Sequence, residues 1–191
     1  MLSKSAPASD DSPVVDPVAR RRDHLWEVSF ETFYDAKYIE VLSERLEGEW
    51  LIVDKVVAVL VALTASGSAV AGWALWKDGT PASLWAVLSG SAALLAIVHS
   101  TLGVPATLKA HGECRRYFTH LSLDIESLRM RMRTNQSFDI DTLEAQFDDC
   151  RKRFSSGIGL RQADLLSTRR FQVKVQEALN EQLADEIVPD A

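Results

Sequence analysis

Residues 56–76 read VVAVLVALTASGSAVAGWALW, a stretch without a single Asp, Glu, Lys or Arg. A second charge-free stretch covers residues 79–108, although the 191-residue chain carries 21 Lys and Arg and 27 Asp and Glu. A helix of residues 56–76 is about 31 Å long, which matches the hydrocarbon core of a bilayer. The sequence therefore predicts an all-α membrane protein, and excludes a simple soluble, disulfide-rich or wholly disordered chain.

The two stretches predict a two-helix transmembrane hairpin over residues 55–109, with spans 56–76 and 82–104. Only the segment 77–81, which contains Gly and Pro, lies between them, so the helices are expected to be antiparallel neighbours. The alternative, two helices of a soluble core, requires more covering surface than this chain has. The tryptophans near the ends of the spans are expected at headgroup depth; they are Trp50, Trp73, Trp76 and Trp85.

Basic residues concentrate outside the turn of this hairpin. They include Arg20–Arg22 and Lys55 before the first span, and Lys109 after the second, whereas the turn has Lys77 alone. By the positive-inside rule, both termini are expected in the cytoplasm.

Two spans cannot enclose water, so a conducting form of this protein requires a homo-oligomer. Small and hydroxylated side chains on the spans are the candidates for a pore lining, with a histidine at the inner mouth; alternatively, the small residues only close the hairpin. The candidate lining residues are Ser66, Ser68, Ser89, Ser91 and His99.

His99 is the one ionisable side chain within the spans, and an intramembrane histidine is a functional candidate by default. Three roles fit its position near the cytoplasmic end: a gate, a pH-sensitive lining group, or a partner for Asp54. The alternative is a neutral imidazole that forms a hydrogen bond with the hydroxyl of Ser100 or Thr101.

On the cytoplasmic side, residues 1–22 are expected to form a disordered tail, followed by an amphipathic helix at 23–54 with an acidic polar face. Residues 110–133 form a basic helix whose apolar residues repeat at spacings of three and four, as in a coiled-coil seam. The hairpin places these two helices side by side, so we expect them to pair. The candidate helix-pair or oligomer contacts are Tyr34, Tyr38, Phe118, Leu121, Ile125, Leu128, Arg115 and Arg116.

Residues 134–191 are predicted to form a C-terminal helical extension. One helix starts with a cap at Asp139 or Asp141, and residues 155–159 interrupt the pattern. A last helix is expected from Asp164 to Ile187. The apolar faces of the two helices contain Leu143, Phe147, Cys150 and Phe154, and Phe171, Val175, Leu179 and Leu183.

Sequence motifs for catalysis are absent, so we expect no enzyme, no catalytic residue and no cofactor. His111 and Cys114, with His120 or Cys150, lack the paired short spacings of a zinc site, so no metal is expected. The net charge of −6 and the acidic neighbours available to the arginines argue against a nucleic-acid partner.

The layout of residues 30–133, with Tyr34, Tyr38, Arg45 and the segment Arg115-Arg116-Tyr117-Phe118, resembles the SLATT superfamily of bacterial two-helix membrane effectors. The resemblance implies a pore-forming effector of prokaryotic antiviral defence, located in the bacterial inner membrane. It also implies that a nucleotide second-messenger synthase or a sensor protein is encoded nearby. The segment 134–191 departs from the core of that family.

Two other functions remain open on the sequence alone. One is a non-conducting scaffold that recruits a cytoplasmic partner, in which any unrelated membrane anchor could replace the hairpin without loss of function. A third interpretation is a subunit of a larger transporter.

Overall fold

The computed structural model describes residues 16–75, 90–91, 93–97, 99–101, 103–134, 139–161 and 163–187, with the backbone alone beyond Ala62 in the first helix and beyond Ala184 in the last. Within these residues the protein is all helical, which confirms the predicted fold class at that level. The four helices are α1 (Pro17–Leu75), α3 (Val104–Thr134), α4 (Ile140–Ile158) and α5 (Arg169–Ile187).

Helix α1 is continuous over 59 residues. It joins the predicted amphipathic helix 23–54 to the described part of the predicted span 56–76. The sequence pattern predicts these two segments as separate helices. Between Val18 and Ser66 the sequence has no Pro and a single Gly, Gly48, and an isolated glycine does not end a helix that packing supports.

The N-terminal end of α1 corrects one prediction. Residues 17–22, expected in a disordered tail, are helical, and Pro17 occupies the first helical position, where its fixed φ is favourable. The guanidinium of Arg21 forms ion pairs of 2.6 Å with both Asp141 and Glu144 of α4. These carboxylates raise the pKa of Arg21, mainly through the hydrogen bond to Glu144. The rest of the predicted tail, residues 1–15, lies outside the described residues.

Helix α3 packs along α1 through the predicted apolar seam. Phe118, Leu121 and Ile125 are fully buried. They form one cluster with Phe33, Ala36 and Ile39 of α1, Cys150 of α4, and Leu179 and Leu183 of α5. Burial of each large apolar side chain contributes about 1.5–3 kcal/mol, so this seam supplies much of the driving force for folding.

Helix α4 packs along α3 and begins beside the N-terminal part of α1, where Leu25 lies. Asp139 caps it: one carboxylate oxygen accepts hydrogen bonds from the backbone N–H and the hydroxyl of Thr142, which confirms the predicted cap. The Thr142 hydroxyl is the main reason that the pKa of Asp139 is lowered. The beginning of α4 packs in a second cluster, which contains Leu25, Leu128, Met132, Ile140, Leu143 and Phe147.

Helix α4 does not stop at residue 155 as predicted but continues to Ile158. Gly157 lies inside the helix and is buried against α3, where a Cβ would come within 2.4 Å of Cε1 of Tyr117. The hydroxyl of Tyr117 donates a hydrogen bond of 2.6 Å to the carbonyl of Arg153. Gly157 is therefore required for the close approach of α3 and α4, rather than for a break in the chain.

Helix α5 starts at Arg169, later than the predicted start at Asp164. Thr168 ends the preceding segment, and its hydroxyl accepts a hydrogen bond of 3.3 Å from the N–H of Phe171, as a cap residue does. Val175 packs on α1 in a third cluster with Leu42 and Leu46.

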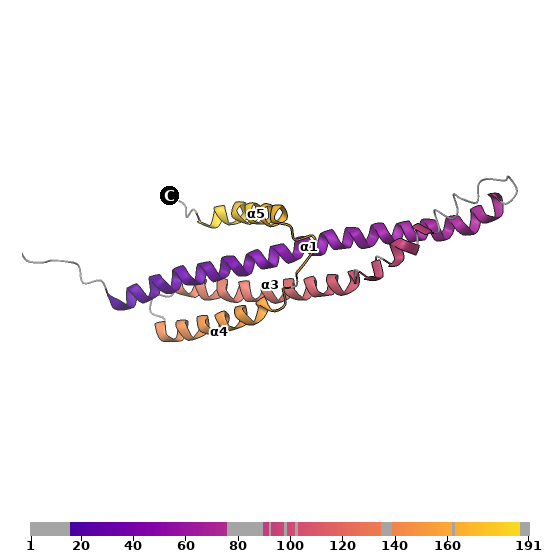
Figure 1. The fold of residues 1–191 in the computed structure, drawn as a ribbon. Helices are drawn as coiled ribbons and strands as arrows, with labels where there is room; N and C mark the ends of the chain where they lie inside the picture. The colour runs from indigo at the N-terminus through magenta and orange to yellow at the C-terminus, as the bar shows by residue number, and fades with distance from the viewer. Residues whose placement is uncertain are drawn as a thin grey trace, which may run out of the picture.

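Helix α1 is the longest element of the molecule, and α3 lies beside it (Figure 1). At one end both continue beyond α4 and α5. We call this end the apolar extension; it contains residues 51–60 of α1 and, before α3, Leu94 and Ile97. Gly103, with φ of 57° in the left-handed region, separates α3 from the helical residues 99–101. Within the described residues, one stretch, Ala93–Thr134, has the length and composition to cross a membrane. Of its apolar 18-residue segment, 6% is buried inside the protein.

The Gly157–Tyr117 contact predicts a selective packing defect. Gly157→Ala forces the Tyr117 ring or α4 to move, and overpacking of this kind costs about 1–3 kcal/mol. Gly159→Ala is the matched control, because its Cβ meets the carbonyl oxygen of Ser156 at an ordinary 3.5 Å. Thermal unfolding of the purified chain, followed by circular dichroism, should show a lower Tm for Gly157→Ala than for Gly159→Ala. Equal values would contradict the close α3–α4 contact.

Candidate functional site: the junction of the bundle and the apolar extension

A buried carboxylate joins three parts of the chain where the bundle meets the extension. The side chain of Asp164 is 1% exposed, and its Oδ2 accepts hydrogen bonds from Nε1 of Trp50 at 2.7 Å and from Nε2 of His111 at 2.5 Å. Trp50 belongs to α1 and His111 to α3, while Asp164 lies between α4 and α5. This junction triad therefore fastens the C-terminal extension to the pair of long helices.

The local sequence holds Asp164 in a tight turn. Its Oδ1 accepts a hydrogen bond of 2.7 Å from the N–H of Leu166, and its carbonyl accepts one of 3.2 Å from the N–H of Ser167. This pattern is an Asx turn, in which the side chain takes the place of a backbone group. All the polar contacts of the carboxylate are thus made inside the protein, which offsets the cost of its burial.

The direction of the hydrogen bond between His111 and Asp164 depends on the tautomer of the imidazole. With the Asp164 carboxylate ionised, the carboxylate only accepts, and Nε2 of His111 is the donor. The His111 side chain is 7% exposed. The imidazole therefore acts here as an oriented donor to a buried acid.

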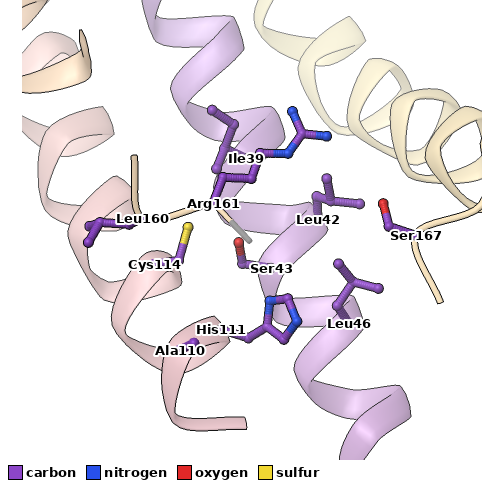
Figure 2. Close-up of a pocket in the computed structure, with 10 residues that line it drawn as sticks. All are labelled: Ile39, Leu42, Ser43, Leu46, Ala110, His111, Cys114, Leu160, Arg161 and Ser167. Carbon is purple, nitrogen blue, oxygen red and sulfur yellow. The ribbon is translucent and has the colours of Figure 1, made fainter. Parts of the chain in front are cut away.

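A cavity of about 20 Å³ lies beside His111, between α1, α3 and the segment before α5 (Figure 2). It has room for about one water molecule and none for a substrate. In Figure 2, Cys114 and His111 come from the same face of α3, with Ser43 opposite them on α1. Within the described part of the chain, no group of three His, Cys, Asp or Glu side chains is placed to hold a metal.

A second polar pair lies further along the extension. Nε2 of His99 is 2.9 Å from Oδ1 of Asp54, with side chains that are 28% and 38% exposed. Of the roles considered for His99, the structure therefore shows the partnership with Asp54. The hydroxyl of Thr101, one of the alternative partners, donates instead to the carbonyl of Ile97 at 2.7 Å.

The other candidate lining residues are not brought together with His99 by the described structure. Ser66 and Ser68 lie where α1 is described by its backbone alone, and Ser89 lies outside the described residues. Ser91 is exposed. Their grouping around a pore stays a prediction.

The candidate helix-contact residues fall in three groups. Phe118, Leu121, Ile125 and Leu128 are buried in the seam, and Tyr34 and Tyr38 pack at its edge. The Tyr34 hydroxyl donates to Oδ1 of Asn180 on α5 at 2.6 Å. Arg115 pairs with Glu47 of α1 at 3.2 Å, whereas Arg116 is exposed, with no ion pair within 4.0 Å among the described residues.

Sequence reasoning missed two features of this region. Trp50 was expected at headgroup depth as a membrane-facing ring, but it is 5% exposed and its N–H binds Asp164. The guanidinium of Arg129, assigned to acidic partners, lies 4.4 Å from the ring centre of Trp26 and 4.8 Å from that of Phe30. The helical spacing of the two aromatic residues is visible in the sequence, but their cationic partner lies on another helix.

A larger groove lies between α3 and α4, away from the junction triad. Its volume is about 490 Å³, and its walls carry Asp124, Arg131, Asp149 and Arg153. Arg153 forms an ion pair of 2.7 Å with Asp124, which raises the pKa of Arg153. Burial raises the pKa of the Cys150 thiol on the groove wall, so this cysteine is less nucleophilic than a free one. The groove is open and has charges of both signs.

Comparison of the chain with protein-family models, with curated proteins and with solved structures gave no match.

The junction triad predicts an energetic coupling between α1 and the C-terminal extension. Trp50→Phe removes one donor from a carboxylate that stays buried, which costs about 1–3 kcal/mol. The expected fall in Tm is about 2–4 °C per kcal/mol for a chain of this size. Trp26→Phe is the matched control, since a Phe ring keeps part of the stacking on Arg129.

A double-mutant cycle tests whether the two side chains act together. The combined loss for Trp50→Phe with Asp164→Ala should be smaller than the sum of the single losses, because both remove the same hydrogen bond. Additive losses would show that the bond contributes nothing to stability.

Proposed function

We propose that this protein is a two-span membrane effector of a prokaryotic antiviral defence system. In this proposal, the apolar half of α1 crosses the inner membrane and residues 82–104 form the returning span that leads into α3, with both termini in the cytoplasm. Several hairpins assemble on a cytoplasmic signal and permeabilise the membrane. The observation that carries the proposal is the single 59-residue helix that joins a packed four-helix bundle to an apolar extension with exposed side chains.

The extension has the surface of a lipid-facing element. Residues 56–76 and 79–108 of the sequence contain no Asp, Glu, Lys or Arg. The bundle buries the apolar seam of α3, whereas several large apolar side chains of the extension are 40–64% exposed. In water this exposure is unfavourable by about 25 cal/mol per Å² of apolar surface, and in a bilayer the cost disappears. The exposed residues are Leu51, Ile52, Val56, Val59, Leu60, Leu94 and Ile97.

The continuity of α1 supports coupling between the bundle and the bilayer. A helix without a hinge transmits a tilt or rotation of its bundle half to its apolar half. The hydrogen bonds of Asp164 to Trp50 and His111 connect the segment between α4 and α5 to the two long helices. A displacement of α4 or α5 is therefore transmitted to the extension through these bonds. The Asp54–His99 pair lies at the inner end of the proposed span, where intramembrane polar pairs are commonly functional.

The defence assignment comes from the SLATT resemblance of residues 30–133 and from the proposed topology. A nucleotide second messenger or a sensor protein is the proposed trigger.

One observation favours a second function, a non-conducting membrane anchor that recruits a cytoplasmic partner. The open groove of about 490 Å³ between α3 and α4 offers charged side chains to such a partner. In this alternative, the hairpin only tethers the bundle.

The two functions predict opposite results for replacement of the hairpin. Bacterial cells that express the chain, with and without its neighbouring genes, are loaded with a membrane-potential dye. We expect depolarisation with the native chain and none after residues 55–109 are replaced by an unrelated two-span hairpin of equal length. The swapped chain must still fractionate with the membrane, as a control for insertion.

The absence of depolarisation by the native chain in every condition would remove the effector proposal. Depolarisation that survives replacement of the hairpin would favour the anchor instead.

A further inference from the structure

The connector between α4 and α5, described at residues 159–161 and 163–168, lies at the end of the two C-terminal helices that is nearest to the apolar extension. Helix α4 begins against Leu25 and Met132 and ends with Gly157 against Tyr117. Helix α5 begins near Leu46 and runs back, so that Leu183 reaches the cluster of Phe33. Both helices therefore have their connector ends directed toward the extension (Figure 1).

The junction triad sets the level of this connector along α1. Asp164, in the connector, binds Trp50, and Trp50 is separated from Val56, where the charge-free stretch starts, by about 9 Å at 1.5 Å per residue. The headgroup region adds about 5–8 Å on each side of the hydrocarbon core. If the extension spans a bilayer, the connector lies at the outer edge of the lipid headgroups.

The end of α4 and the connector expose large apolar side chains. Leu165 is 79% exposed, Ile158 is 49% exposed and Leu160 is 41% exposed. Leu165 stands between Asp164, which is buried in the triad, and Leu166, whose N–H bonds to that carboxylate. A tight turn therefore holds the Leu165 side chain outward.

Within the described connector and the first turn of α5, the exposed charged side chains are basic, in a chain of net charge −6. Arg169 and Arg170, at the start of α5, are both exposed. The acidic residue of the connector, Asp164, is buried and bound to donors, so it offers no exposed negative charge. Exposed apolar side chains beside basic ones are the pattern that binds the interface of an anionic leaflet.

From these observations we propose that the connector and the first turn of α5 dock on the surface of an anionic membrane leaflet, with Leu165 inserted among the headgroups and Arg169 and Arg170 against lipid phosphates. The inference rests on the proposed function, because it needs the extension to span that membrane. Docking there holds the C-terminal extension at the bilayer and places the junction triad next to the lipid surface.

The test measures depth with a nitroxide label on single cysteines in the full chain, reconstituted into vesicles with phosphatidylglycerol or with phosphatidylcholine alone. The native Cys114 and Cys150 are buried, and the wild-type chain treated with the same reagent sets the background. Leu165→Cys reports docking, and Ile97→Cys reports the proposed span. Met130→Cys, on an exposed position of α3 within the bundle, reports water.

We expect the label at residue 165 to be shielded from a water-soluble nickel relaxer and accessible to oxygen in anionic vesicles, and to become several-fold more accessible to nickel in zwitterionic ones. A label at 165 that is as accessible to nickel as the one at 130 overturns the docking, while a lipid-exposed label at 97 keeps the proposed function. A water-exposed label at 97 overturns both. Shielding at 165 that is independent of lipid charge and grows with protein density indicates a second copy of the chain and overturns the docking.

Removal of charge from matched basic pairs tests the role of Arg169 and Arg170. Arg169→Gln with Arg170→Gln should remove at least half of the shielding that depends on phosphatidylglycerol. Arg151→Gln with Lys152→Gln, an exposed basic pair on α4 further from the extension, should leave it unchanged. Equal effects of the two pairs would contradict a site at the connector.

Discussion

The apolar seam of α3 lies against α1 along the bundle, and the positions of α4 and α5 depend on this contact. Phe118 is fully buried where the four helices meet, and the edges of its ring touch the aromatic neighbours Tyr117 and Phe154 at about right angles. Because α1 and α3 form a continuous surface, α4 covers one part of it and α5 another. Without the seam, neither short helix has an apolar face to cover.

The bundle and the extension differ in the side chains that they expose, and α1 runs through both without a break. In the bundle, charged groups occupy the outside and form ion pairs between helices, as Arg21 does with Glu144 and Arg153 with Asp124. In the extension, apolar side chains such as Ile52 and Ile97 face outward. Asp54 and His99 lie near the change and satisfy each other at 2.9 Å. The junction triad marks the same boundary from inside the bundle.

The proposed effector function and the proposed lipid docking assign complementary tasks to this boundary. In these proposals, the spans would provide the membrane-active part and the bundle would receive the signal. The connector that carries Leu165 lies between them, tied to α1 and α3 through one buried carboxylate. A change in the packing of α5 acts directly on Leu42 and Leu46 of α1. A displacement of the connector acts on Trp50 and His111, which lie on the helices that continue into the extension.

The sequence by itself determined the helical class, the seam residues of α3, a helix cap at Asp139 or Asp141 and the two charge-free stretches, because these follow from local spacing and composition. Tertiary structure alone decided that α1 is one helix, that Gly157 makes room for Tyr117, and that Asp164 binds Trp50 and His111. A buried hydrogen bond between residues far apart in the chain leaves no periodic signal. Asp164 therefore resembled a helix start, and Trp50 a membrane-facing ring, until the fold placed them together.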